Sequence, residues 1–433
     1  MHRLILQIAL PSIISNITVP LLALADTAIA GHLGAASYIG AIAIGGMIFN
    51  MIYWLFGFLR MGTGGLTAQA YGAGNQTEAL RILLRSLSVA AVVSSLLIVL
   101  QQPLADLAFS MISTTPEVEK QARIYYTLLI GGAPAVLGLY SMTGWFLGMQ
   151  NARIPMYIAI VQNLVNIGIS LSLVAGLGWK VEGVATGTLV AQYAGFIIAA
   201  ALWYRHYRSL ATADSRQNIF NRQAFGRFFN VNRDIFLRTL CLIAVSTYFT
   251  SAGAAQGELT LAGNTLLMQF FIIFSYIMDG FAYAGEALGG RCLGASQRSA
   301  FKLLTYRLFQ WGGLLMLLFT ITYLIGGEGL LRLLTNSDAV RHAATSYLPY
   351  AIAIPAVSFA AFLYDGLFIG TTSTRYMLWT MACSCCIFFL LIGTLPSGNT
   401  SLWLAFLAYL GSRSTIQALL YPKVKARFGR YSK

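Results

Sequence analysis

Charged residues are scarce in this sequence, and their scarcity limits the class of protein. Asp, Glu, Lys and Arg together make up 10% of the 433 residues, whereas hydrophobic residues make up 57% and the mean hydropathy is +0.70. Soluble globular domains usually contain about 25% charged residues. A water-exposed surface is therefore excluded for most of the chain, and we interpret it as an all-α integral membrane protein.

Sequence patterns for common catalytic and ligand-binding sites are also missing. The five cysteines suggest no disulfide framework, and Cys383, Cys385 and Cys386 have no His or acid at metal-like spacing. No Gly-x-x-x-x-Gly-Lys-Ser/Thr motif is present, and the four histidines form no recognisable arrangement with Ser or Cys. We expect no ATP hydrolysis, no enzyme activity, no metal and no cofactor, apart from a coupling ion, H⁺ or Na⁺.

Long apolar segments are what the sequence has in abundance. A helix needs about 20 apolar residues to cross the hydrocarbon core of a bilayer. Segments of this kind lie near residues 4–30, 38–70, 83–108, 124–149, 155–177, 183–204, 234–255, 259–290, 303–326, 345–370, 376–394 and 401–421. The sequence therefore predicts twelve transmembrane helices.

The chain also repeats itself at an offset of 222 residues. Gly144-Trp-Phe-Leu-Gly148 matches Gly366-Leu-Phe-Ile-Gly370, and Tyr125 matches Tyr347 at the same offset. Duplicated helical bundles are typical of secondary transporters, whose sites lie between the repeats. Six spans per half give both halves the same orientation, so we predict two parallel-repeat six-helix lobes around a central cleft. The predicted divisions are an N-terminal lobe at 1–204, a basic cytoplasmic linker at 205–232, a C-terminal lobe at 233–422 and a basic cytoplasmic tail at 423–433.

Basic residues favour one orientation in the membrane. Lys and Arg accumulate in cytoplasmic loops, and they are concentrated here in alternate loops, in a cluster from Arg205 to Arg238 and in the C-terminal tail. We therefore expect a multi-pass protein of the inner (plasma) membrane with both termini cytoplasmic. The net charge of +14 is explained by this topology and by attraction to anionic membrane lipid, so we expect no nucleic-acid partner.

Four acids fall inside predicted spans: Asp26, Asp279, Glu286 and Asp365. An ionised side chain at a helix centre costs about 2.5–3.5 kcal/mol on insertion scales, and such residues often bind ions, protons or substrate. Asp26 follows Pro20, which can bend the helix and free backbone carbonyls. We therefore interpret Asp26 as a proton or sodium site. The alternatives are an acid paired permanently to a neighbour and a span end misplaced by one turn.

Neutral polar residues in the fifth and sixth spans can complete this site. Asn163, Asn166 and Ser170 share one helix face, and Gln192 adds an amide from the next span. We assign these residues to cation coupling together with Asp26. Amides of this kind also hold membrane helices together through hydrogen bonds, and this structural role is the alternative.

The eighth span contains a second polar face. Tyr276, Asp279, Tyr283 and Glu286 follow at steps of three, four and three, so they share one stripe of the helix. Aromatic faces attract cations and carboxylates supply the opposite charge, so the stripe predicts a cation path. Tyrosines of an interfacial belt are the alternative.

A glycine-flanked acid and a possible gate complete the candidate sites. Asp365 precedes Gly366, as Asp279 precedes Gly280, and glycine permits close approach of a helix or ligand. We assign Tyr276, Asp279, Tyr283 and Asp365 to a substrate-binding or second-half cation site. Arg60 is the one base clearly inside a predicted span, and the repeat maps it to Ala282, one turn before Glu286. We hypothesise that Arg60 and Glu286 form an ion pair that gates the cleft.

Several motifs resemble those of multidrug and toxic compound extrusion transporters, specifically the branch of DNA-damage-inducible protein F. They are Leu10-Pro11 through Pro20, Asp26-Thr-Ala, Gly31-His32, Phe58-Leu-Arg60-Met, Thr67-Ala-Gln69-Ala-Tyr-Gly72, Asn232-Arg-Asp234-Ile, Asp279-Gly-Phe-Ala-Tyr283 and Asp365-Gly-Leu-Phe-Ile-Gly370.

The resemblance covers nearly the whole chain. It implies two six-helix lobes, alternating access and export of organic, lipophilic cations in exchange for protons or sodium, with Asp26 as the coupling carboxylate. The sequence departs from the family at Ser170, where members often have an acid four residues after the equivalent of Asn166. A two-acid ion site in the first lobe is therefore doubtful.

Two other functions remain as alternatives: a lipid-linked saccharide flippase of related build, and an intramembrane enzyme. A flippase for anionic pyrophosphate lipids needs several Arg or Lys in its cavity. The predicted spans contain four acids against Arg60, with Arg413 near the end of the last span. This balance favours a cation exporter, with small organic cations and membrane lipid as partners and a monomer as the expected state.

Overall fold

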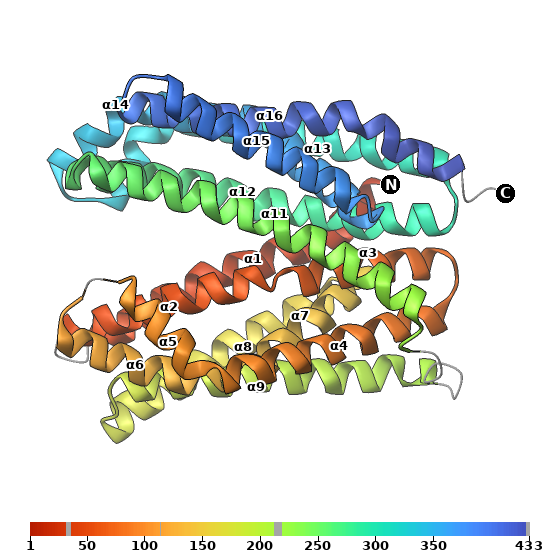
Figure 1. Ribbon diagram of the computed structural model, residues 1–433, viewed down its shortest axis with the longest axis horizontal. Helices are drawn as coiled ribbons and strands as arrows, with labels where there is room; N and C mark the ends of the chain where they lie inside the picture. Colours follow the sequence, from red (N-terminus) through yellow and green to blue (C-terminus); the bar gives the residue numbers. More distant parts are fainter. Residues whose placement is uncertain (32–35, 113, 212–218, 430–433) are drawn as a thin grey trace. The chain divides into compact units, whose positions relative to one another are not determined.

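The computed structural model describes residues 1–31, 36–112, 114–211 and 219–429, and this part of the chain is almost entirely helical (Figure 1). His32, quoted above in a motif, part of the predicted linker at 212–218 and the end of the tail at 430–433 lie outside the described residues. The helices up to the linker are α1 (His2–Gly31), α2 (Ala36–Leu55), α3 (Phe58–Gly72), α4 (Gln76–Val99), α5 (Gln101–Ser110), α6 (Pro116–Ile130), α7 (Ala133–Gly148), α8 (Arg153–Leu171), the π-helix η1 (Ser172–Gly176), α9 (Val181–Tyr207) and the 3₁₀-helix η2 (Arg208–Leu210). Those after it are α11 (Arg222–Ala255), α12 (Glu258–Gly294), α13 (Arg298–Leu334), α14 (Asp338–Gly370), α15 (Thr374–Thr394), α16 (Asn399–Ala426) and the 3₁₀-helix η3 (Arg427–Gly429).

The chain forms two compact units. The N-terminal unit is Pro11–Phe229, and the C-terminal unit combines Met1–Leu10 with Asn230–Lys433. The imidazole of His2 illustrates this grouping, because it accepts a hydrogen bond of 3.1 Å from the indole of Trp311 on α13. The predicted divisions at residues 204, 232 and 422 stay predictions.

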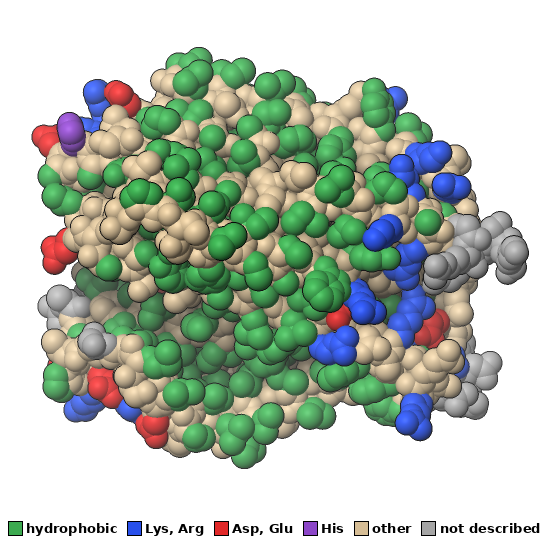
Figure 2. Space-filling view, turned by 45° about the horizontal axis from the view of Figure 1, so that its top comes forward, with side chains coloured by type: hydrophobic (Ala, Val, Ile, Leu, Met, Phe, Trp, Pro, Cys, Tyr) green, Lys and Arg blue, Asp and Glu red, His purple; other side chains and the backbone are tan. Residues whose placement is uncertain are grey.

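Ten helices of the described chain are long and apolar enough to cross a membrane, and there are eleven if α6 and α7, bent by 53°, form one span. The remaining predicted segment, 401–421, corresponds to α16, which has 28 residues and contains the buried Arg413. Large apolar side chains such as Val99 and Ile325 are mostly exposed, and hydrophobic side chains cover much of the surface drawn in Figure 2. An apolar surface of this kind suits lipid as the solvent. The protein is a multi-pass membrane protein of all-α fold.

Two predicted spans are interrupted in the structure. The segment predicted at 38–70 divides into α2 and α3 at Phe56–Gly57, and the segment at 124–149 divides into α6 and α7 at Gly131–Gly132. Pro134 lies in the first turn of α7, where its missing N–H prevents the helical hydrogen bond to the preceding turn. Apolar composition alone concealed both breaks.

The turns confirm the internal repeat. Gly74 and Ser296, which are 222 residues apart, both have positive φ angles, 70° and 56°. Gln150 and Thr372 are related by the same offset and have φ of 65° and 50°. Left-handed backbone is rare for residues other than glycine. Its recurrence at matched positions shows that the two halves share their turn geometry.

Helix packing repeats as well. A Cβ atom added to Gly144 on α7 would lie 2.1 Å from the carbonyl oxygen of Arg60, and one added to Gly366 on α14 would lie 2.1 Å from that of Ala282. Both glycines therefore let two helices approach with backbone against backbone. The offset decreases in the last helices, since α16 begins 218 residues after α9.

Each unit has its own apolar core. Trp145 and Phe146 on α7 are fully buried in the N-terminal unit, and Phe270 on α12 and Trp403 on α16 are fully buried in the C-terminal unit. The N-terminal core also contains a chain of hydroxyl groups: Thr63 donates to Ser86 at 2.7 Å, and Ser86 donates to Ser141 at 2.7 Å. This chain joins α3, α4 and α7.

Candidate functional site

Asp26 is a half-buried carboxyl group near the end of α1. Its Oδ1 atom is buried and accepts no hydrogen bond from the described residues. Tyr125 of α6 interacts electrostatically with Asp26, and its hydroxyl lies within hydrogen-bonding reach of Thr188 on α9. The Tyr125 ring fits against α2 because Gly45 has no side chain; a Cβ there would lie 2.3 Å from the ring. Asp26 therefore lies beside a polar group with its own acceptor atom unused.

Asn166 and Ser170 extend this polar region along α8. Both are fully buried, and the Asn166 amide donates to the Thr188 hydroxyl at 2.9 Å. Thr188 in turn donates to the Val184 carbonyl at 3.0 Å. Asn166 Oδ1 and Ser170 Oγ have no hydrogen-bond partner among the described residues. Buried acceptors without partners are costly, so this region is suited to hold a proton or cation.

Asn163 and Gln192 lie farther from Asp26. Asn163 donates to the Thr18 carbonyl at 2.9 Å, and Thr18 precedes Asp26 by roughly 12 Å along an undisturbed helix. The Gln192 amide packs at the α6–α7 break, where a Cβ on Gly132 would lie 1.8 Å from its Oε1. The structure thus connects Asn166 to the Asp26 region, whereas the coupling roles assigned to Asn163 and Gln192 stay predictions.

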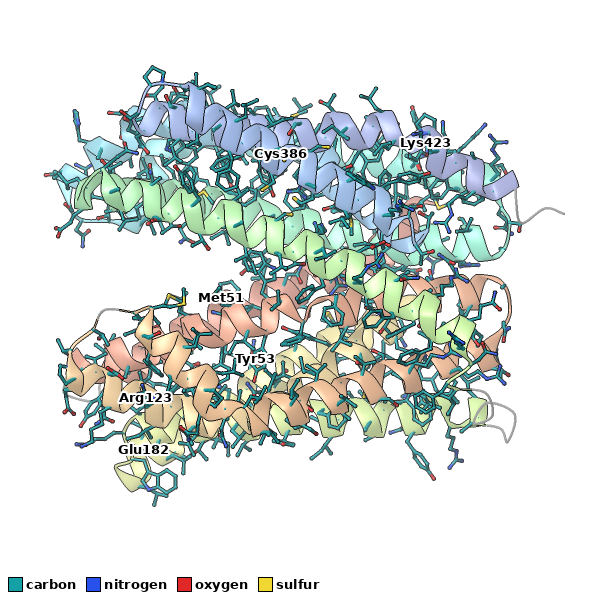
Figure 3. All side chains as sticks on the ribbon, in the orientation of Figure 1. Met51, Tyr53, Arg123, Glu182, Cys386 and Lys423 are labelled. Atoms are coloured by element: carbon teal, nitrogen blue, oxygen red, sulfur yellow. The ribbon has the colours of Figure 1, made fainter. Side chains whose placement is uncertain are left out.

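A group of tyrosines in the N-terminal unit was missed from the sequence. Tyr53 on α2, labelled in Figure 3, interacts electrostatically with four other tyrosines, one of which is Tyr125 beside Asp26. The hydroxyls of Tyr53 and Tyr126 are buried without a hydrogen-bond partner in the described chain. The other three members of the group are Tyr126, Tyr140 and Tyr193. These residues come from four separate helices, so no spacing in the sequence could reveal them.

Asp365 on α14 is held differently. Its Oδ2 accepts hydrogen bonds from Arg238 and, at 2.9 Å, from Arg413, and its Oδ1 accepts one of 2.5 Å from Gln417. All four side chains are buried. The carboxylate is therefore neutralised by the protein's own guanidinium groups, and its assignment to a cation or substrate site stays a prediction.

Asp279 on α12 belongs to the same charged region, because it interacts electrostatically with Arg413 as well as with Tyr276. The count of bases inside the spans was consequently wrong: Arg238, expected among the surface charges, and Arg413 are both buried with Asp365. Their guanidinium groups bind a carboxylate, so they do not provide the open phosphate site of a flippase. Tyr283 lies two turns after Tyr276 on α12.

The proposed gate residues lie in different units. Arg60 on α3 interacts electrostatically with Tyr140 of the N-terminal unit. Glu286 on α12 is 1% exposed, and its carbonyl oxygen would be 2.2 Å from a Cβ on Gly370 in the C-terminal unit. Their ion pair stays a prediction. For metals, the described residues contain no group of three or more His, Cys, Asp or Glu suited to hold an ion.

Comparison with known proteins identifies the family. The MatE family model matches residues 11–171 and 235–394, well over half of the chain. The chain is 37% identical over 418 residues to DNA damage-inducible protein F of Escherichia coli (strain K12), covering 96% of this chain and 91% of that protein. Its fold resembles the crystal structure of MATE in the bent conformation, with a TM-score of 0.86, 16% identity and coverage of 99% of this chain and 97% of that one. It also resembles a multidrug resistance MATE family transporter in an outward-facing conformation, with a TM-score of 0.84, 16% identity and coverage of 100% and 97%. The chain therefore belongs to the MatE family of membrane transporters.

Proposed function

We propose that this protein exports organic, lipophilic cations in exchange for protons or sodium by alternating access, with Asp26 as the coupling group. The observation that carries the proposal is the Asp26 carboxyl group, whose buried Oδ1 lacks a hydrogen-bond partner among the described residues. It lies beside Tyr125, which reaches toward Thr188 and thereby toward Asn166. A transport cycle needs a carboxyl group that can exchange its ligand, and Asp26 is held more loosely than Asp365.

The proposed cycle rests on two ligands that favour different states. A proton or sodium ion on Asp26 cancels the negative charge and favours release of the organic cation. Loss of that ion restores the charge and favours entry of a new cation. Coupling of this kind requires a difference in affinity between the two states for each ligand.

The tyrosine group supports a cationic, aromatic-binding substrate class. Tyr53 and Tyr126 offer ring faces together with unused buried hydroxyls, and Tyr125 connects the group to Asp26. Ring faces attract cations and bury flat apolar molecules. The similar transporter described as a multidrug resistance protein fits a site that selects by charge and shape more than by one functional group.

The proposal includes a location and a state of assembly. The protein acts as a monomer in the inner (plasma) membrane, with both termini cytoplasmic. The basic residues between Arg205 and Arg238 and in the C-terminal tail support this orientation, because cytoplasmic loops are rich in Lys and Arg.

Transport in proteoliposomes tests the proposal. Efflux of a fluorescent lipophilic cation would be measured under an imposed proton gradient and, separately, an imposed sodium gradient. The proteins compared are the wild type, Asp26→Asn and Glu258→Gln, which removes an exposed acid at the start of α12. We expect wild type and Glu258→Gln to follow one of the gradients, and Asp26→Asn to show no gradient-driven efflux.

Two results would contradict the proposal. Gradient-driven efflux at the wild-type rate by a monodisperse Asp26→Asn protein would remove Asp26 from the coupling step. Failure of the wild type to move any lipophilic cation under either gradient, in vesicles shown to contain folded protein, would argue against cation exchange.

A further inference from the structure

A hollow on the surface of the N-terminal unit lies at the start of α11. It has a volume of about 590 Å³ and is lined by Phe220, Arg222, Phe225, Gly226 and Phe229. The rings of Phe220 and Phe229 are 65% and 59% exposed. Three aromatic rings and one guanidinium group thus surround an open space that the proposed transport cycle does not use.

The hollow is held in shape by buried arginines. Arg85 of α4 donates from Nε to the Ile219 carbonyl at 2.5 Å, and Arg227 donates to the Gln69 side chain at 2.6 Å. The Asn221 side chain caps α11 by accepting from the backbone N–H of Gln223 at 3.0 Å. The segment is therefore attached on both sides of Arg222, and the hollow exists before any ligand arrives.

The length of α11 places the hollow near the membrane surface. α11 has 34 residues, whereas about 20 suffice to cross the hydrocarbon core. Its first two turns, Arg222–Phe229, precede the more apolar remainder and so extend to the depth of the lipid headgroups. Aromatic rings with a nearby basic group are common at this depth, because one part is apolar and the other is wet.

The charge around the hollow is positive. Between residues 205 and 229 the sequence has five Arg and one acid, Asp214. Arg205, Arg208 and Arg222 are exposed, whereas the acid Glu78 on α4 is paired to Arg85 at 2.6 Å. A ligand with a negative headgroup and an apolar body matches this combination.

We propose that the hollow binds one anionic phospholipid. Arg222 binds the phosphate group, and Phe220, Phe225 and Phe229 contact the glycerol and the upper part of the acyl chains. This site is separate from Asp26 and does not depend on the proposed exchange reaction.

Gly226 offers a sharp test. A Cβ atom added there meets no atom within 4 Å, so a larger side chain fits without a clash. Gly226→Glu puts a carboxylate into the hollow, Gly226→Gln is its neutral match, and Arg222→Gln removes the phosphate-binding group. Lys302→Gln, an exposed base on α13, controls for general loss of positive charge.

Binding would be measured by native mass spectrometry of purified protein with phosphatidylglycerol, phosphatidylcholine and inorganic phosphate. A basic residue near a membrane surface contributes about 1 kcal/mol, or roughly fivefold in affinity. We expect the wild type to prefer phosphatidylglycerol to phosphatidylcholine by at least that factor. Arg222→Gln should lose about fivefold for phosphatidylglycerol, Gly226→Glu at least as much, and Gly226→Gln and Lys302→Gln much less.

Three results would overturn the proposal. One is equal affinity of the wild type for the two lipids. Another is unchanged phosphatidylglycerol binding by both Arg222→Gln and Gly226→Glu, each shown to be monodisperse and helical by circular dichroism. The third is inorganic phosphate that binds as tightly as phosphatidylglycerol with the same dependence on Arg222, since the site would then recognise phosphate without lipid.

Discussion

Asp26 and Asp365 are both acids in membrane helices, yet the protein treats them in opposite ways. Asp26 in the N-terminal unit leaves one oxygen without a hydrogen-bond partner in the described chain. Asp365 in the C-terminal unit has two arginines and a glutamine on its oxygens. The difference indicates that one acid is available for an exchangeable ligand, whereas the other holds helices α11, α14 and α16 together.

The wider comparison of the two halves supports this division of roles. Backbone features recur at the 222-residue offset, as the contacts of Gly144 and Gly366 illustrate. Side-chain chemistry does not recur: Asp365 corresponds to Thr143, and Asp279 corresponds to Gly57 at the α2–α3 break. The repeat therefore preserves the close approach of helices and leaves the polar groups free to differ.

Removal of each acid should break the comparison most clearly. Asp365→Ala leaves Arg238 and Arg413 buried without their carboxylate, and losing one partner of a buried ion pair typically costs about 3–5 kcal/mol. Asp26→Asn should change the free energy of unfolding by far less. Denaturant titration in mixed micelles, followed by tryptophan fluorescence, measures both. A larger loss from Asp26→Asn than from Asp365→Ala would reverse our interpretation of the two sites.

Alanine at the paired glycines should sharpen the comparison, because the repeat predicts equal effects. Gly144→Ala and Gly366→Ala each push a methyl group against a backbone carbonyl, and overpacking of this kind costs about 1–3 kcal/mol. Gly168→Ala on α8 and Gly313→Ala on α13 meet no atom within 4 Å and serve as controls. They should be neutral or stabilising by up to about 1 kcal/mol. Unequal losses at Gly144 and Gly366 in the same unfolding assay would argue against equivalent packing.

The smallest expected effect concerns the hydroxyl chain that only the N-terminal unit has. Ser86→Ala removes the link between Thr63 and Ser141, and a hydrogen bond of this type contributes about 1 kcal/mol. Ser88→Ala on the same helix is the matched control, because Ser88 bonds to its own helix at the Leu84 carbonyl. In the second half the corresponding positions are Gly285, Leu308 and Leu363. Equal stability of the two variants would mean that the chain contributes nothing beyond packing.

The sequence predicted the helices and the repeat well, because both depend on local composition and on matched residues. Apolar runs identify spans regardless of how they pack, and the 222-residue offset can be read from the motifs around Gly144 and Gly366. Breaks inside an apolar run were harder to predict. The division of α2 from α3 at Gly57 leaves the hydropathy of residues 38–70 unchanged.

The charged pairs could not be predicted, since they join residues far apart in the chain. Arg238 and Asp365 are separated by 127 residues, and Arg413 and Asp365 by 48. An arginine near the end of an apolar segment looks like a surface residue until the structure shows which helix faces it. Asp26 was more accessible to prediction, because an acid well inside an apolar run is unusual without any knowledge of its neighbours.

The π-helix η1 adds a last point about how duplicated chains diverge. It directly follows α8, so α8 and η1 together span 24 residues, whereas α15 has 21 and the 222-residue offset has fallen to 218 when α16 begins. Inserted residues in helices are commonly absorbed as π-turns, which often occur beside functional sites. Ser170 lies just before η1, and the region of α15 that could correspond to it, 388–392, is wholly apolar. One copy has thus gained length next to its polar site, and past this point the second copy can no longer serve as a template for the first.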